Sequence, residues 1–159
     1  MMSLEESAKR LAELVPQIMG AFHDLGRQHP DEGQLTMRQY QALIIVGACK
    51  ELTLSQFCEK LALAASTGTE LANRMIALEY FSKSTDPIDR RQVTLSITAK
   101  GREMLRQRRQ ALQDMFIRFL DTFSDQDRTD FVMSFQRIFD LFSKAAWLKL
   151  EKAESSHTA

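Results

Sequence analysis

The chain has 159 residues, of which 44% are apolar, and 21 basic and 21 acidic side chains leave it without net charge. This length suits one domain with helical extensions, and no apolar run approaches the roughly 18 to 20 residues that span a bilayer. Residues 1–10 lack the apolar segment of a secretory signal. Cys49 and Cys58 lie at no metal-binding spacing. We therefore expect a reduced, cytoplasmic protein that binds no membrane, metal or cofactor.

Apolar residues recur at helical spacing from Leu4 to Leu25 and predict a first helix that begins at Ser3 or Ser7. Pro16 lies inside this pattern, where proline can kink a helix. Residues 26–33 contain two glycines and a proline and are expected to form a loop. Residues 1–34 are thus predicted to be an N-terminal helix followed by a loop.

Three shorter helices are predicted next. The first begins near Thr36 and places Tyr40, Leu43, Ile44, Val46 and Gly47 on its apolar face. Residues 53–56, Thr-Leu-Ser-Gln, match a capping box and predict the start of a helix that reaches Leu61. Another helix is expected over about 65–80, with Leu71, Met75 and Leu78 as its apolar positions. Two short helices joined by three or four residues have the spacing of a helix-turn-helix.

A β-hairpin is expected between residues 80 and 97. The runs 80–84 and 92–97 are extended in character, and apolar and polar residues alternate in the second. Asp86-Pro87 supplies turn chemistry between them, and Arg90 and Arg91 lie at the tip. Thr98 is the predicted N-cap of the next helix. The pattern suits the wing of a winged helix-turn-helix, and equally a plain surface hairpin with a solvated tip.

The positive charge of the chain is local. Residues 80–110 carry eight basic and three acidic side chains, a net charge of +5, whereas the segments before and after carry −3 and −2. A local basic patch can contact phosphates although the whole chain is neutral. The alternative is a solvated charged helix face, which applies best to residues 106–109.

Two long helices are expected after the hairpin, over about 99–121 and from Ser124 onward, with a polar tail at 151–159. Seven of the ten phenylalanines fall between residues 116 and 142, and residues 131, 135, 138 and 142 repeat like a coiled-coil seam. A second copy of the chain is the economical partner, and an intrachain bundle is the alternative. The predicted dimer contacts are Leu11, Phe119, Phe123, Phe131, Phe135, Ile138 and Phe142.

The order of elements and several motifs resemble the MarR family of winged helix-turn-helix transcriptional regulators. Residues 35–44, 52–63 and 66–78 look like the family's second, third and recognition helices. Asp89 to Gly101 is similar to the wing signature D-x-R-x₅-L-T-x-x-G, with Ile97 in place of the leucine. The predicted fold is mainly helical with a small β-hairpin wing.

The resemblance implies a homodimeric bacterial regulator, usually a repressor, that binds a pseudo-palindromic operator in double-stranded DNA. Residues 35–101 would form the DNA-binding lobe, with the recognition helix in the major groove and the wing in the minor groove; residues 1–34 and 102–150 would form the dimer. The family also implies modulation by a small-molecule or oxidative signal. The implied DNA contacts are Ser55, Ser66, Thr67, Thr69, Asn73, Arg74, Lys83, Asp89, Arg90 and Arg91.

Three residues depart from the family pattern. Ala64 stands at the position of the usual capping serine, and Gly68 lies inside the recognition helix, at a cost of about 1 kcal/mol relative to alanine. Glu70 stands where arginine is frequent. Its carboxylate either accepts from cytosine N4 or repels phosphate, and the sequence leaves both possibilities open.

An enzyme and a protein-interaction module are the two other classes of function to consider. No serine or cysteine lies in a nucleophile motif and no glycine-rich phosphate loop occurs, so the sequence offers no basis for an enzyme. A winged-helix dimer that lost strong DNA affinity and serves protein interaction is the alternative, because the recognition helix carries no net charge. Cys49 and Cys58 could form a redox switch, although buried small apolar residues are the simpler interpretation.

Overall fold

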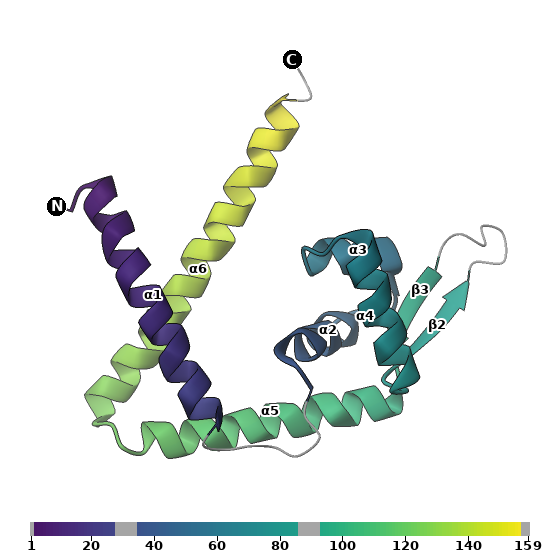
Figure 1. Cartoon of the computed structure of the whole chain (residues 1–159), viewed down its shortest axis with the longest axis horizontal. Helices are drawn as coiled ribbons and strands as arrows, with labels where there is room; N and C mark the ends of the chain where they lie inside the picture. Colours follow the sequence, from purple (N-terminus) through teal and green to yellow (C-terminus); the bar gives the residue numbers. More distant parts are fainter. Residues whose placement is uncertain (1, 28–34, 86–92, 157–159) are drawn as a thin grey trace. The chain divides into compact units, whose positions relative to one another are not determined.

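The computed structural model describes residues 2–27, 35–85 and 93–156 (Figure 1). The chain divides into two compact units, residues 1–115 and 116–159, which are described separately. The elements are α1 (Leu4–Arg27), α2 (Met37–Gly47), β1 (Leu52–Thr53), α3 (Leu54–Lys60), α4 (Ala65–Ala77), β2 (Phe81–Thr85), β3 (Val93–Ile97), α5 (Ala99–Leu120) and α6 (Asp125–Ser156). None of these helices, over the described residues, is both long and apolar enough to cross a membrane.

Polar caps fix where the helices begin. The side chains of Thr36 and Thr53 each accept a hydrogen bond from the backbone amide three residues on. The side-chain oxygen of the glutamine at that position accepts one from the threonine amide, which completes two capping boxes. Ser3 exchanges the equivalent pair with Glu6, at 3.1 and 2.8 Å, so α1 begins after Ser3 and not after Ser7. The Ser124 hydroxyl accepts from the Asp127 amide at 3.1 Å. The predicted caps of α3 and α6 are therefore confirmed.

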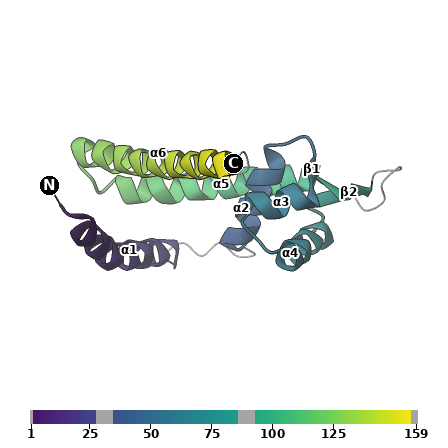
Figure 2. The same ribbon diagram turned by 90° about the horizontal axis from the view of Figure 1, so that it is seen from above.

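The three strands form an antiparallel sheet in the order β1-β3-β2. Phe81 pairs with Ile97 and Leu52 with Leu95, so the apolar residues of the strands share one face. The strands β1 and β2, both labelled in Figure 2, are therefore the two edge strands, and β3 is the central one. The hairpin prediction is confirmed, and its tip, residues 86–92, lies outside the described residues. The strand β1 was missed, because two residues are too few to show an alternating pattern.

The core of the lobe lies where α2, α3 and α4 meet the sheet. Phe57, Leu43 and Met75 are fully buried, and the Phe57 ring meets the edge of Phe81 at a centroid distance of 6.1 Å. Of the apolar positions predicted for α4, Leu71 and Met75 are buried, whereas Leu78, the C-cap residue, is 39% exposed. Together these contacts hold α3 and α4 side by side (Figure 1).

A compact junction joins β2, β3 and α5. The Thr98 amide donates to the Tyr80 carbonyl oxygen at 3.0 Å, and the Thr98 hydroxyl donates to the Glu79 carbonyl oxygen at 2.7 Å. The same hydroxyl accepts from the Gly101 amide at 2.9 Å, which confirms Thr98 as the N-cap of α5. A β-carbon on Gly101 would lie 2.3 Å from the Tyr80 carbonyl oxygen. The glycine is therefore required by the close approach of helix and strand.

The second unit, residues 116–159, contains the end of α5, a turn, and α6. Its aromatic rings cluster at the turn: Phe119 lies 5.5 Å from Phe131, and Phe131 lies 4.9 Å from Phe135, centroid to centroid. The predicted tail was wrong in part, since α6 continues to Ser156. Residues 151–156 contain helix-forming Glu, Lys and Ala and neither glycine nor proline, so nothing local ends the helix earlier.

The N-terminal helix also extends further than its pattern predicted. It includes Pro16 without interruption of the helical backbone and ends at Arg27, so Gly26 is helical and not part of a loop. The rest of the predicted loop, residues 28–33, lies outside the described residues.

Replacement of Gly101 by alanine tests the junction. Since the added methyl group meets backbone, which cannot rotate away, we expect unfolding to become easier by about 1–3 kcal/mol, or about 2–4 °C in Tm for each kcal/mol. The matched control is Gly20→Ala in α1, where no atom lies within 4 Å of the added carbon. That variant should be as stable as the parent or more stable by up to about 1 kcal/mol. Equal Tm values for both variants in thermal melts would contradict the role of the junction.

Candidate nucleic-acid interface

The helix α4 has one buried and one exposed face. Its buried residues are Gly68, Leu71, Ala72 and Met75. Its exposed polar residues are Ser66, Thr67, Glu70, Asn73 and Arg74. Short hydroxyl and amide side chains on an exposed helix face can donate to and accept from base edges or phosphates. The structure thus brings four of the five residues predicted from this helix together on one surface.

Thr69, the fifth predicted residue of α4, lies at the border of that surface. It is half-buried, and its hydroxyl donates to the Ala65 carbonyl oxygen at 2.7 Å. With its proton engaged in the helix, this hydroxyl offers a ligand only an acceptor. Ser55 is exposed in the first turn of α3.

Gly68 has a packing role that the sequence did not reveal. A β-carbon at this position would lie 2.2 Å from Cys58 Sγ and 3.3 Å from Cys58 Cβ. The glycine therefore lets α3 and α4 approach closely, and the buried Cys58 fills the space beside it. The propensity cost predicted for Gly68 is thus matched by a helix contact that no larger residue would allow. Ala64, at the N-cap of α4, provides no side-chain hydrogen bond, as its sequence predicts.

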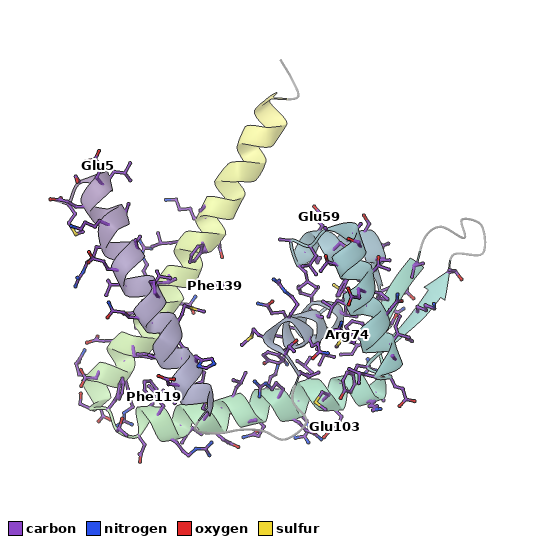
Figure 3. The ribbon with its side chains drawn as sticks, in the orientation of Figure 1. Glu5, Glu59, Arg74, Glu103, Phe119 and Phe139 are labelled. Carbon is purple, nitrogen blue, oxygen red and sulfur yellow. The ribbon has the colours of Figure 1, made fainter. Side chains whose placement is uncertain are left out.

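The two charged side chains of α4 are paired with each other. Arg74 Nη2 donates to Glu70 Oε1 at 2.8 Å, one helical turn apart, and both side chains are more than half exposed (Figure 3). An exposed pair at this spacing contributes only about 0.3–0.5 kcal/mol. Its consequence is electrostatic: the exposed face of α4 presents a neutral, internally hydrogen-bonded pair.

Two cations of the predicted basic patch, Lys100 and Arg106, are paired with carboxylates of the chain. Lys100 Nζ contacts Glu79 Oε2 at 2.7 Å, and this ammonium holds the pKa of the Glu79 carboxyl below its usual range. Arg106 makes two hydrogen bonds to Glu103, at 2.7 and 2.9 Å. These bonds and one from Gln107 lower the pKa of Glu103 to about 2. These cations are therefore less available to phosphates than the net charge of +5 implied.

The remaining predicted contacts belong to the hairpin. Lys83 is exposed on β2, the edge strand of the sheet. Asp89, Arg90 and Arg91 lie outside the described residues.

The sequence did not predict a contact of Arg38. This residue of α2 donates to the Leu61 carbonyl oxygen at 3.3 Å, at the turn between α3 and α4. Twenty-three residues separate the two groups, so no local pattern could indicate this contact.

The predicted dimer contacts fall into two groups. Phe119, Phe123 and Phe131 are half-buried in the aromatic cluster of their own chain, with ring centroids 4.9–5.8 Å apart. Leu11, Phe135, Ile138 and Phe142 are exposed, with Phe142 at 73%. Within the described chain, other large apolar residues of α1 and α6 are exposed as well: Leu4, Val15, Ile18, Met19, Val132, Met133, Phe139 and Leu141.

Comparison with known proteins agrees with this geometry. A winged helix DNA-binding domain model matches residues 35–101, which contain the whole described lobe from α2 to the start of α5. An uncharacterized HTH-type transcriptional regulator, YsmB of Bacillus subtilis (strain 168), is 27% identical over 139 residues, or 85% of this chain and 88% of YsmB.

Two solved structures share the fold. A MarR family protein from Bacillus stearothermophilus is 22% identical, covers 89% of this chain and 99% of its own, and superposes with a TM-score of 0.72. FabT of Streptococcus pneumoniae, solved in complex with DNA, is 18% identical, covers 86% and 98%, and gives a TM-score of 0.65. At these identities the structures establish the fold and not the ligand or DNA sequence.

The matched model identifies residues 35–101 as a winged helix DNA-binding domain. The chain shares the fold of a MarR family protein, in agreement with the predicted order of elements.

The contact of Gly68 with Cys58 can be tested by a double-mutant cycle. Gly68→Ala places a methyl group against Sγ, and we expect it to destabilise the lobe by about 1–3 kcal/mol. In the background of Cys58→Ala, which removes the sulfur, the same change should cost much less, so that the two effects are not additive. Denaturant unfolding of the four proteins measures the coupling. Additive losses would show that the close approach does not exist in solution.

Proposed function

We propose that the protein is a homodimeric regulator that binds a pseudo-palindromic site in duplex DNA and represses transcription by occupying it. The observation that carries the proposal is the exposed polar face of α4. The opposite face of this helix is buried, and its Gly68 packs closely against α3. A helix presented in this way fits the major groove, where each base pair offers a distinct pattern of donors and acceptors.

The division of labour between α4 and the wing follows from their charge. Ser66, Thr67 and Asn73 are neutral and suit base edges, whereas α4 as a whole brings no net charge to the phosphates. The hairpin, residues 80–97, carries Lys83, Arg90 and Arg91 together with two aspartates, a net charge of +1. Arginine is always charged and weakly hydrated, which suits the narrow, electronegative minor groove. We infer that the wing contributes most of the affinity and α4 most of the sequence preference.

The dimer is supported by the apolar surface of α1 and α6. Ile138 and Phe142 are 46% and 73% exposed, although phenylalanine and isoleucine are among the residues that proteins bury most often. Repeated apolar side chains on exposed helix faces mark an interface with another helix. A second copy of the chain, related by a twofold axis, would cover them and would also present two copies of α4 to two half-sites.

A winged-helix module that binds protein and not DNA is the second candidate. The observation that favours it is the Glu70–Arg74 pair, which leaves the recognition helix without net charge. Such a protein would form the same dimer but would show no salt-dependent binding to duplex DNA.

Modulation by a small molecule or an oxidant remains a prediction from the family resemblance. Cys58 has a packing function against Gly68 whether or not it has a redox function.

Arg91→Ala tests whether the wing anchors DNA. Each lost phosphate contact lowers the slope of log K against log salt by about 0.9, so a dimer should lose up to about 1.8 and bind all sequences more weakly. Fluorescence anisotropy over a salt series measures this on a duplex selected from a randomised pool and on the unselected pool. Arg137→Ala, the same charge change on an exposed position of α6, should leave the slope unchanged. If Arg91→Ala retains affinity and slope, the interaction-module candidate moves ahead.

Phe142→Asp tests the dimer. A charge placed in an apolar interface is costly, so we expect monomers or aggregates at micromolar concentration in light scattering. Met133 offers a matched control: it is 62% exposed and lies nine residues away, half a turn around α6. Met133→Asp should remain dimeric. A monomeric parent protein at the same concentration would exclude the proposed assembly.

A further inference from the structure

The Glu70–Arg74 pair lies in the middle of the surface that would enter the DNA groove. Ser66 and Asn73 lie one turn on either side of Glu70, and all four side chains are exposed on the same helix face. Glu70 Oε1 accepts from Arg74 Nη2 at 2.8 Å. A carboxylate at this place must affect DNA binding, because phosphates line both sides of the major groove and repel a negative charge.

We propose that Glu70, acting through Arg74, is a filter that rejects phosphate contacts and makes α4 accept only sites with a suitable base amino group. The proposal rests on DNA binding through α4. Glu70 is therefore assigned as a positioning and specificity-determining residue of that site.

Arg74 is one of two charged side chains on α4 and the natural phosphate ligand of the helix. A free guanidinium would bind phosphate without regard to sequence. The pair with Glu70 occupies one of its amino groups and directs it along the helix. In water this pair is weak, but in a groove from which water is partly excluded its attraction increases. Arg74 is then held for base edges, where guanine offers two acceptors.

Glu70 also has hydrogen-bond acceptor sites that Arg74 does not use. A carboxylate has about four lone-pair sites, and Arg74 uses one of its two oxygens. When the carboxylate loses water in the groove, the other oxygen must find a donor or its desolvation is not compensated. In the major groove the donors are the amino groups of cytosine N4 and adenine N6. Guanine and thymine present only acceptors there, so a G or T opposite Glu70 should be rejected.

Glu70→Gln tests this, because it keeps the shape and removes the charge. A randomised duplex pool is selected in parallel with the parent protein and with the variant, and binding of the unselected pool is measured at 50 and 200 mM salt. We expect the parent to enrich cytosine or adenine at one position in each half-site and the variant to lose that preference. If Arg74 then turns to phosphate in both protomers, the affinity lost over this salt range should grow about tenfold.

Glu103→Gln is the matched control, since Glu103 is an exposed glutamate hydrogen-bonded to an arginine one turn away, on α5 (Figure 3). It changes the net charge equally and should leave the enriched sequences unchanged. Comparison of Glu70→Gln/Arg74→Ala with Arg74→Ala separates the two effects. Without Arg74, Glu70→Gln should still lose the preference for cytosine or adenine but should no longer increase the salt dependence.

Three results would overturn the inference. The first is a Glu70→Gln variant with the parent's base preference and salt dependence. The second is an equal change of base preference in Glu103→Gln, and the third is an equally large increase of the salt dependence when Glu70→Gln is added to Arg74→Ala. A parent protein that enriches no sequence and binds no duplex would instead remove the proposed function, and this inference with it.

Discussion

The structure depends on the close approach of α5 to Tyr80, the residue directly before β2. There is no room for a side chain at Gly101 beside the Tyr80 carbonyl oxygen. The amide and the hydroxyl of Thr98 donate to the carbonyl oxygens of Tyr80 and Glu79, which directly precede β2. These contacts set the position at which β3 ends and α5 begins, and therefore the register of the hairpin against the helix that follows it. The core residues Leu95 and Ile97 of β3 reach the lobe from this anchored end. A wing attached at such a point is a fixed part of the lobe at its base.

A second close approach has the same character at the other end of the lobe. Gly68 allows α4 to lie against Cys58 of α3, and this contact determines which residues of α4 face outward. The exposed face then contains short polar side chains and one ion pair, whereas Lys100 and Arg106, two of the cations that follow the hairpin, are paired with Glu79 and Glu103. In the proposed mode of binding, the neutral helix α4 reads bases and the hairpin holds the DNA backbone.

Local signals explain what the sequence could predict. Capping boxes act over three residues, and alternation in a strand acts over two, so the starts of α3, α5 and α6 and the course of β3 follow from neighbouring residues. Contacts between distant segments gave no such signal. The partner of Gly68 lies ten residues earlier, and Lys100 and Glu79 are 21 residues apart. The glycine was therefore interpreted only as a cost in helix propensity, and the lysine was counted in a basic patch that can contact phosphates.

The candidate site shows the same limit of local reasoning. Ser66, Thr67, Asn73 and Arg74 were predictable because helical periodicity places them opposite Leu71 and Met75. The half-buried setting of Thr69 depends on tertiary packing, and the aromatic cluster of Phe119, Phe123 and Phe131 depends on the turn between α5 and α6. Periodicity alone could not distinguish those phenylalanines from Ile138 and Phe142, which are exposed.

The central claim is that two copies of α4 read two half-sites in the major groove while the wings hold the flanking minor groove. Chemical footprinting of the dimer on a duplex selected from a randomised pool tests it most directly. The account predicts two symmetric zones of protected guanine N7 positions about one helical turn apart, each flanked on its outer side by minor-groove protection. A single unsymmetric zone, or protection confined to the minor groove, would contradict it.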